Sequence, residues 1–470
     1  MKEIRASMRL VGLILVAAIV TATVLFAVTA RVRGARWINL AYNSRLLDAK
    51  KTTVQGTITD KTGTVLSFSP APGVRCYHAD EDMRRALSHT LGDQRNMSET
   101  GVENLHASTL LGITDTRTGY TLRRLAGYDP TGNDIALTVN AELTRSLAEA
   151  FPKGKNGAAV MINYRTGAIL AMVSFPNYDP ANMGSWDTDT AYFNRVLRYA
   201  YAPGSTFKIV TLTAALESVQ DVENEIFHCP GVWNYAGNSL RCASNAAHGD
   251  VGLLEAFARS CNVTFGALAH TVGAPYLKET AERFGFNYDF SFDDVILYES
   301  KCLADDPDNH ELIQTGIGQG KTQATPLHMA MIAGAIANGG EMMAPKLIFK
   351  VTSPAGTVLR TMEPELFRVV ASREQCETVA RYMYETVKSG TATRAAVPNY
   401  AGYVCGKTGS AEWTDDKSAP TNAWYTGFLY GDDSHPYAIA VVVEQGGSGG
   451  TVAAPVAAKA FEKAIELGAY

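Results

Sequence analysis

The sequence carries no excess of positive charge. Its 42 lysines and arginines are outnumbered by 47 aspartates and glutamates, which gives a formal net charge of −5. Proteins that bind nucleic acid concentrate positive charge against the phosphates, so the composition gives no support for a nucleic-acid partner. Internal repeats and low-complexity tracts are also absent, which argues against a solenoid or a disordered chain. With 46% hydrophobic and 19% charged residues, the composition is that of a globular protein.

Cysteine is uncommon and never occurs as a C-x-x-C pair. The seven cysteines are Cys76, Cys229, Cys242, Cys261, Cys302, Cys376 and Cys405. Without such a pair a zinc ribbon or a dithiol redox motif is not supported, and we predict no metal and no cofactor. Cys229 and Cys242 bracket a loop rich in Gly and Asn. Outside the cytoplasm they could be bridged, and two free thiols are an equal alternative. We interpret His248 as a loop histidine.

One long segment contains no charged residue at all. It runs from Leu10 to Ala30, reads LVGLILVAAIVTATVLFAVTA, and is long enough as a helix to cross a membrane. Because the apolar centre of a cleaved signal peptide is shorter, we predict a retained anchor rather than a signal peptide ending at Ala30. Basic residues flank both ends, so the positive-inside rule gives no orientation.

The chain is long enough for two or three domains. Its best internal boundary is PKGKNG, Pro152–Gly157. We therefore predict a cytoplasmic tail and membrane anchor over 1–31, a smaller domain over 32–151 and a larger domain over 152–470. In the smaller domain we expect two short strands around Lys61-Thr62-Gly63, mostly helix over 75–124, a strand over 135–139 and a helix capped by Asn140.

The larger domain begins and ends with strands. GAAVMINYRTGAILAMVSFP, at 157–176, predicts a hairpin of two apolar strands, and 404–413, 422–430 and 437–445 are further strand candidates. Most of the sequence between them is helical or loop. This order predicts an α+β fold, with one antiparallel sheet sandwiched by helices.

Three short motifs in a fixed order suggest chemistry. They are STFK (Ser205 to Lys208), SCN (Ser260, Cys261, Asn262) and KTGS (Lys407, Thr408, Gly409, Ser410). Each motif taken alone also has a non-catalytic interpretation. Ser205 could cap a helix, Lys208 could be a solvated charge, and SCN could be a polar turn. Their conjunction and order favour a catalytic explanation for the whole set over a structural one.

The residue types fit a serine nucleophile with a lysine base. Positions three apart share a helix face, so Lys208 can reach the Ser205 hydroxyl. Burial and a second cation such as Lys407 would lower the pKa of Lys208 enough for it to accept a proton. Ser260 is placed to pass a proton to the leaving amine, and Asn262 to hydrogen-bond Lys208 and the substrate amide.

The third motif has the composition of a substrate-binding strand. Gly409 has no side chain, so a substrate backbone can lie against it as an added strand. Thr408, Ser410 and Lys407 could hold a terminal carboxylate, and the N–H groups of Ser205 and Ser410 could form an oxyanion hole. We interpret Trp413 and Trp424 as strand packing and Tyr178-Asp179 as a turn.

At these motifs the chain resembles the penicillin-binding transpeptidases of bacterial cell-wall synthesis. The likeness extends over about two thirds of the chain, from Gly157 to the end, and includes YAPGSTFKIVTL, ARSCNVTFG, IGQGKTQATPLHMA and CGKTGSAEW. GTITDKTGTVLS and GVENLHASTLLG resemble the N-terminal region of the monofunctional, class B members. Too few residues lie between Ala30 and Pro152 for the glycosyltransferase domain of class A members. In the middle motif Cys261 stands where the common pattern has Asp.

The resemblance implies acyl transfer. Ser205 would attack the D-Ala-D-Ala end of a peptidoglycan stem peptide, and the acyl-enzyme would pass to an amine on a neighbouring strand. β-Lactam antibiotics would acylate the same serine. The resemblance also implies a single-pass protein of the cell membrane, with its catalytic domain outside the cytoplasm and a membrane glycosyltransferase as partner.

Other functions fit the motifs less well. A serine β-lactamase would normally be shorter and secreted, and a D,D-carboxypeptidase would release the acyl group to water. A β-lactam sensor of this fold carries H-E-x-x-H, but the nearest string, His310–Gln314, ends in Gln. A non-catalytic subunit of the wall-synthesis complex should have lost Ser205, Lys208 or Lys407. Turnover of a pentapeptide would separate these alternatives.

Overall fold

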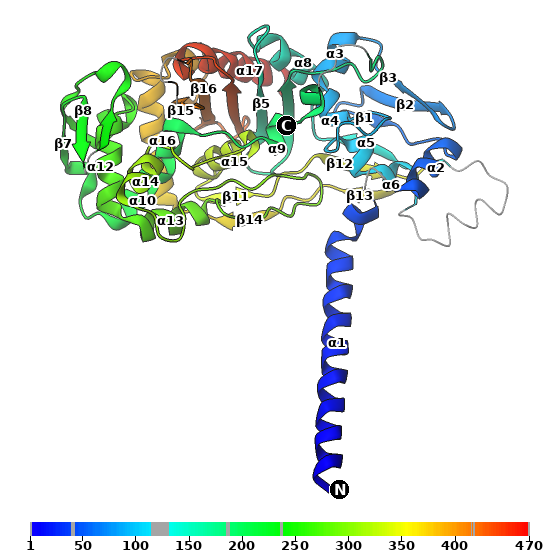
Figure 1. Cartoon of the computed structure of the whole chain (residues 1–470). Coiled ribbons are helices and arrows are strands. Elements are labelled where there is room, and N and C mark those ends of the chain that lie inside the picture. Colours follow the sequence, from blue (N-terminus) through cyan, green and yellow to red (C-terminus); the bar gives the residue numbers. More distant parts are fainter. Residues whose placement is uncertain are drawn as a thin grey trace.

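A computed structural model describes residues 2–38, 43–113, 131–184, 189–235, 238–414, 416 and 419–468. Its first helix, α1 (Lys2–Ile38), stands apart from the folded body of the molecule (Figure 1). The helix contains Leu10–Thr29, a segment of mean hydropathy 2.8 with none of its surface buried in the protein. By length and composition this helix can cross a membrane.

A six-stranded sheet takes its strands from both halves of the sequence. The order is β13-β12-β4-β1-β2-β3. The bounds are β1 (Ile58–Thr59), β2 (Val65–Ala71), β3 (Val74–Tyr77), β4 (Asp134–Leu137), β12 (Ile348–Thr352) and β13 (Val358–Thr361). β12 pairs antiparallel with β4, with Val351 opposite Ile135. The boundary that we propose near residue 151 therefore divides the chain but not this sheet.

Short helices cover this sheet. They are α2 (Ser44–Thr52), α3 (Glu81–Ala86), α4 (Ser88–Leu91), α5 (Val102–Leu105) and α6 (Ala107–Leu110). The strands predicted around Lys61-Thr62-Gly63 are β1 and β2, which are antiparallel. The helical prediction for 75–124 holds for α3 to α6 but is wrong at its start, where the chain is β3; residues 114–130 lie outside the described residues.

The larger domain is built on a five-stranded antiparallel sheet in the order β15-β16-β17-β5-β6. Its strands are β5 (Gly157–Asn163), β6 (Ile169–Phe175), β15 (Tyr403–Ala411), β16 (Asn422–Tyr430) and β17 (Tyr437–Val443). The predicted hairpin and the three predicted C-terminal strands are all present. Successive residues of β5 enter different cores: Val160 packs on one face of the sheet and Ala159 and Met161 on the other, as the twofold period of a strand requires.

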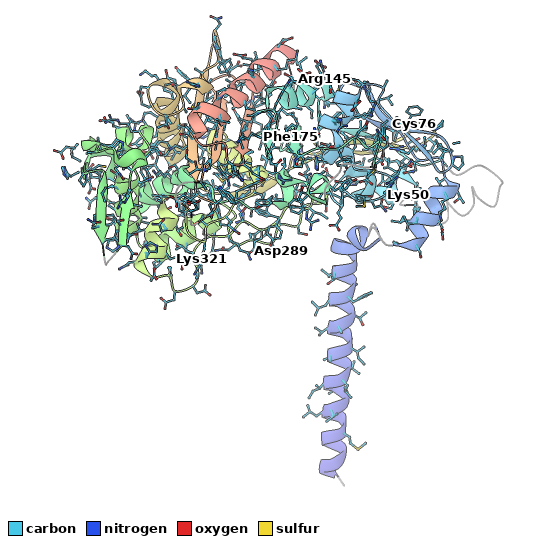
Figure 2. The ribbon with its side chains drawn as sticks, turned by 45° about the horizontal axis from the view of Figure 1, so that its top comes forward. Lys50, Cys76, Arg145, Phe175, Asp289 and Lys321 are labelled. Atoms are coloured by element: carbon cyan, nitrogen blue, oxygen red, sulfur yellow. The ribbon has the colours of Figure 1, made fainter. Side chains whose placement is uncertain are left out.

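Helices cover both faces of this sheet, which confirms the predicted α+β fold (Figure 1). α8 (Ala141–Ala150) and α17 (Ala454–Leu467) pack on one face, and α15 (Pro326–Ala337) on the other. Asn140 caps α8 as predicted, its Oδ1 accepting from Leu143 N at 2.9 Å. Arg145, on the outer side of α8 in Figure 2, pairs with glutamates of the same helix, and Phe175 at the end of β6 stacks on Phe151.

The segment between β6 and β15 supplies most of the remaining elements. Its helices are α9 (Arg195–Arg198), α10 (Lys208–Ser218), α11 (Leu253–Ala258), α12 (Asn262–Val272), α13 (Ala274–Arg283), α14 (Asn309–Gly316) and α16 (Arg373–Lys388). Its remaining strands are β7 (Ile226–Cys229), β8 (Val232–Tyr235), β9 (Asn238–Arg241), β10 (Gly249–Gly252), β11 (Glu341–Met343) and β14 (Leu366–Val369). β7 pairs with β10 and β8 with β9, so these four strands form two small ribbons at one end of the molecule (Figure 1).

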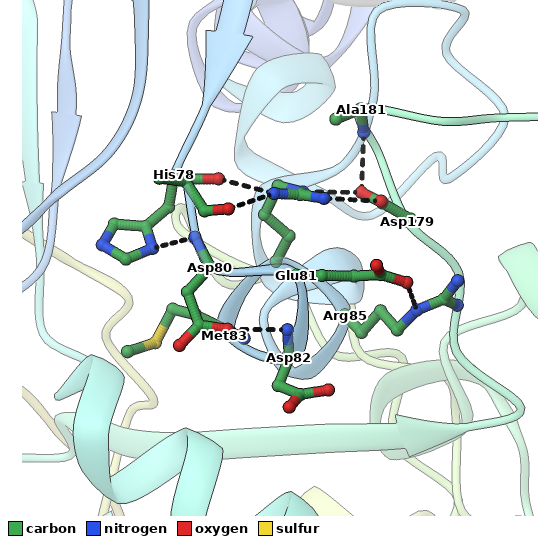
Figure 3. Close-up of polar contacts among 10 residues, drawn as sticks. His78, Asp80, Glu81, Asp82, Met83, Arg85, Asp179 and Ala181 are labelled. Atoms are coloured by element: carbon green, nitrogen blue, oxygen red, sulfur yellow. Dashed lines mark hydrogen bonds and ion pairs between the residues drawn. The ribbon is translucent and has the colours of Figure 1, made fainter.

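An ion pair joins residues on the two sides of the predicted boundary near residue 151. Arg84 of α3 donates from Nε and Nη2 to the two carboxylate oxygens of Asp179, each at 2.8 Å, and its Nη1 donates to the carbonyl oxygens of His78 and Ala79 (Figure 3). Asp179 also accepts from Ala181 N at 3.0 Å, which confirms the predicted turn. Arg84 lowers the pKa of the Asp179 carboxyl, so the carboxylate stays ionised at the junction.

Candidate active site

Ser205 lies on a tight turn at the start of α10. A 3₁₀ turn over Gly204–Phe207 leads into the helix, and Ser205 is half-buried while its neighbours Thr206 and Phe207 are buried. Gly204 has a positive φ of 54°, a conformation that favours glycine. The turn leaves the Ser205 side chain at the surface of an otherwise packed element, where a reacting group could approach it.

Gly318 allows the chain to pass directly behind this turn. Gly204 N donates to Gly318 O at 2.8 Å. A Cβ atom on Gly318 would lie 2.1 Å from the carbonyl oxygen of Gly204, so no larger residue fits. Two separate glycines therefore fix the position of Ser205.

Lys208 is fully buried one turn after Ser205 and binds the second motif. Its Nζ donates to Ser260 O and Asn262 Oδ1, each at 2.8 Å, and lies 3.4 Å from Ser260 Oγ. Within the described part of the chain, no hydrogen bond joins Nζ to Ser205 Oγ. Sequence reasoning placed Lys208 on the same helix face as Ser205, but the contacts formed in this structure are with the second motif.

Ser260 has strained backbone geometry. Its φ is 59°, which is left-handed and unusual for a residue with a side chain. The next two residues begin α12, and Asn262 Nδ2 donates to Arg241 O at 2.7 Å, which ties the motif to β9. The strained turn directs both Ser260 and Asn262 at Lys208.

Lys407 approaches the same serine from β15. Its Nζ donates to Ser260 Oγ at 2.9 Å and to Thr408 O at 3.0 Å. Ser260 Oγ thus lies between two lysine amines, one from each of the other motifs. The structure brings the three sequence motifs together at one place, around the hydroxyl of Ser260.

Both amines are difficult to protonate. Lys208 and Lys407 are 0% exposed, and neither forms an ion pair with a described carboxylate. Burial lowers the pKa of Lys208 to about 7. Burial also lowers the pKa of Lys407 well below its usual value, and the charge of Lys208 adds to that effect. A neutral Lys208 amine, one turn after Ser205 in the chain, is therefore accessible near neutral pH, as a general base requires.

The remaining residues of the third motif belong to the edge strand β15. Thr408 Oγ1 lies 2.6 Å from Thr391 Oγ1, and the exposed Ser410 accepts weakly from Gly449 N at 3.4 Å. Gly409 packs closely against the Ser205 turn. A Cβ there would lie 2.8 Å from Pro203 O, so in this structure the missing side chain allows β15 to pack against the Ser205 turn.

The two tryptophans flanking this strand differ. Trp424 is buried, with Nε1 donating to Ala202 O at 3.0 Å, which confirms packing. Trp413 is 51% exposed and lines a cavity of about 800 Å³, so its interpretation as strand packing was wrong. His310 and Gln314 line the same cavity. In the sequence these two residues are interpreted only as part of an incomplete zinc motif. The residues around them do not indicate that α14 lies across a cavity from the end of β15.

The chain matches the family described as the penicillin binding protein transpeptidase domain over residues 157–462. It is 31% identical over 408 residues to the peptidoglycan D,D-transpeptidase PbpA of Mycolicibacterium smegmatis, covering 79% of this chain and 80% of that protein. The family match spans the three motifs and the five-stranded sheet.

Solved structures agree with this assignment. The ceftriaxone acyl-enzyme complex of penicillin-binding protein A from Mycobacterium tuberculosis aligns with a TM-score of 0.80 at 29% identity, over 89% of this chain and all of that chain. The D,D-transpeptidase domain of a peptidoglycan glycosyltransferase from Eggerthella lenta aligns with a TM-score of 0.74 at 30% identity, over 88% and 99%. This chain belongs to the penicillin-binding protein transpeptidase family.

Proposed function

We propose that this protein is a membrane-anchored, monofunctional peptidoglycan D,D-transpeptidase that works through a serine acyl-enzyme on Ser205. The observation that supports this most directly is the convergence of Lys208, Ser260 and Lys407 beside the Ser205 turn, with two buried amines around one hydroxyl. Enzymes that form an ester on a serine need a general base next to that serine.

In the first half-reaction, Ser205 Oγ forms a bond to the carbonyl carbon of the penultimate D-Ala, and its proton passes to neutral Lys208. The carbonyl oxygen becomes an oxyanion, which the N–H groups of Ser205 and Ser410 would stabilise. The C–N bond to the terminal D-Ala then breaks. The leaving nitrogen takes a proton through the Ser260 hydroxyl, and free D-Ala departs.

In the second half-reaction, an acceptor amine of a neighbouring stem peptide attacks the ester carbon. The amine loses its proton to the same Lys208–Ser260 pair, a peptide bond forms, and Ser205 Oγ leaves with a proton. β15 forms one edge of its sheet, which allows a peptide to add as a further strand along Thr408, Gly409 and Ser410. Lys407 could donate a hydrogen bond to the substrate's terminal carboxylate.

Leu10–Thr29 would anchor the protein in the cell membrane with the catalytic domain outside the cytoplasm, where peptidoglycan lies. A membrane glycosyltransferase would then supply the nascent strands. A D,D-carboxypeptidase or a serine β-lactamase would use the same acyl-enzyme but give it to water. A non-catalytic subunit would form a stable adduct with a β-lactam and turn nothing over.

The test combines an adduct with a turnover assay. The full chain in detergent is incubated with benzylpenicillin, and the adduct is mapped by mass spectrometry to a peptide. A synthetic stem pentapeptide ending in D-Ala-D-Ala is then supplied with a D-amino acid acceptor. We expect a penicilloyl group on Ser205 and transfer of the acyl group to the acceptor. Hydrolysis of penicillin, or release of D-Ala without transfer, would support the two hydrolase alternatives instead.

A further inference from the structure

Three cysteines and one histidine from separate stretches of chain lie together beside the second motif. Cys229 ends β7, Cys242 follows β9, His248 precedes β10, and Cys261 is the central residue of the SCN motif. Their ligand atoms all lie within 4.8 Å of one another. The two small ribbons and the start of α12 meet at this cluster.

The distances within the cluster match a tetrahedral metal site. Cys229 Sγ lies 3.6 Å from Cys242 Sγ and 3.3 Å from His248 Nδ1, and Cys242 Sγ lies 3.7 Å from Cys261 Sγ. A tetrahedral zinc ion with sulfur ligands at about 2.3 Å and a nitrogen ligand at about 2.0 Å sets its ligands about 3.5 to 3.8 Å apart. These three separations are close to the spacing that a zinc ion imposes, and the remaining pairs of donor atoms lie within 4.8 Å.

The setting also favours a structural ion. The three cysteines are buried, and Cys261 Sγ accepts from Thr264 N at 3.4 Å and from Thr264 Oγ1 at 3.2 Å. Hydrogen bonds to a ligand sulfur are typical of the surroundings of a metal thiolate. The apolar cluster around the cysteines adds only Val251, Ala256 and Val263 as further buried members. Small ribbons with so little core usually need a cross-link or a metal.

We propose that Cys229, Cys242, His248 and Cys261 bind one Zn²⁺ in a closed Cys₃His site that holds the Ser260–Asn262 loop in place. Three soft sulfur donors and one imidazole nitrogen suit zinc, and four protein ligands leave no open position for catalysis. Because Cys261 lies between Ser260 and Asn262, the ion would fix the strained turn that presents both to Lys208. His248 would then be a ligand rather than an ordinary loop histidine.

A disulfide is the competing arrangement. All described cysteines are free thiols in this structure, including Cys229 and Cys242. A bridge between any two of the clustered sulfurs would leave the third and the imidazole without a shared partner, whereas one ion engages all four. The sequence contains no C-x-x-C motif at this site, because the four ligands come from separate segments of the chain.

The test is metal content. The full chain, purified in detergent without a metal-affinity step, is analysed by elemental mass spectrometry. We expect about one zinc per chain, and a loss of at least about tenfold in Cys229→Ala and Cys242→Ala. Cys376→Ala is the matched control, because Cys376 is buried on α16 outside the cluster and should keep the metal. A folded, zinc-free wild-type chain with two of the clustered cysteines joined by a disulfide in non-reduced peptide maps would overturn the proposal.

A second measurement uses the wild-type chain, so it does not depend on whether the cysteine variants fold. Cobalt exchanged into the wild-type chain should give the near-ultraviolet thiolate-to-metal absorption and the visible bands of a tetrahedral site. Removing zinc with a chelator should lower the unfolding temperature and slow fluorescent-penicillin labelling, and added Zn²⁺ should restore both. Cobalt spectra of an octahedral, sulfur-free site would exclude the Cys₃His assignment. Labelling that stays unchanged after complete zinc removal would refute the role in positioning the loop. These readouts of metal content do not depend on Ser205 being the nucleophile, so the proposed function can fail separately.

Discussion

Lys407 Nζ donates to Ser260 Oγ at 2.9 Å, and Lys208 Nζ lies 3.4 Å from the same oxygen. Two buried amines that share one hydroxyl cannot both hold a proton without a large penalty, because like charges repel strongly where water is excluded. The arrangement favours a state in which one amine is neutral. Ser260 can relay a proton between the two, which connects the base of the proposed reaction to the substrate-binding strand.

Replacing Ser205 by Ala should abolish labelling by a fluorescent penicillin. The variant loses the only group that we propose forms the ester, while its half-buried site tolerates a smaller side chain. Labelling is measured by in-gel fluorescence, with circular dichroism to verify folding. Ser218→Ala is the control, because Ser218 ends the helix that follows Ser205 and its hydroxyl donates only to Ala214 O among the described residues. Labelling that survives in Ser205→Ala would remove Ser205 from the nucleophile role.

Replacing Lys208 by Ala should slow acylation by about 10²- to 10⁴-fold, the usual contribution of a general base. Binding of penicillin before the reaction should change little. Stopped-flow or quenched labelling separates the two steps. Lys388→Ala, which removes a lysine 57% exposed at the end of α16, should leave the rate unaltered. An acylation rate equal to the wild type in Lys208→Ala would exclude Lys208 as the base.

The acylation rate should rise with pH and level off above about 7. Burial lowers the pKa of Lys208 to about 7. Below that pH most Lys208 amines are protonated and cannot accept the Ser205 proton, so the acylation rate falls as the pH is lowered. Above it most Lys208 amines are neutral and can act as the base. The second-order rate constant for penicillin is measured across this range, with thermal unfolding followed at each pH. A midpoint near the ordinary lysine value would contradict the assignment.

Replacing Ser260 by Gly should separate stability from activity. Glycine adopts the φ of 59° found here without strain, so the unfolding temperature should stay the same or rise. Acylation and acyl transfer should nevertheless fall by about 10²-fold or more, because the shared hydroxyl is gone. Ser260→Ala keeps the strain and loses the hydroxyl, which makes it the matched comparison. Equal activity of Ser260→Gly and the wild type would argue against the proton relay.

Replacing Arg84 by Met should destabilise the protein without changing the chemistry. The variant leaves the Asp179 carboxylate, which is 3% exposed, without its partner, and we expect a loss of roughly 1–3 kcal/mol. Urea unfolding of Arg84→Met, Asp179→Asn and the double variant gives the coupling energy of the pair. A coupling energy near zero would show that the pair does not hold the junction. Penicillin labelling at low temperature should stay at the wild-type rate.

Local signals made much of this fold predictable. Two apolar runs around a turn in 157–175 predict β5 and β6, Asn140 predicts the start of α8, and the charge-free segment predicts the apolar part of α1. The spacing within STFK predicts that Ser205 and Lys208 share one turn. Each of these depends on residues a few positions apart, where strand or helix geometry alone decides the outcome.

Long-range packing explains what the sequence reasoning missed. Nothing near Ile348 indicates that β12 joins β4, and nothing near Cys229 indicates that it meets Cys261. Nothing near Gly409 indicates that a Cβ at this position would lie 2.8 Å from Pro203 O, two residues before Ser205. The motif residues were identifiable as a set, whereas their partners depend on how distant segments fold against one another.

The sheet that crosses the domain boundary also constrains the order of events during synthesis. When the first domain leaves the ribosome, β4 has β1 on one side and a bare edge on the other, because β12 has not yet been made. That edge can be completed only after most of the transpeptidase domain has been translated. The N-terminal domain is therefore expected to mature late, as a consequence of the second domain's folding rather than ahead of it.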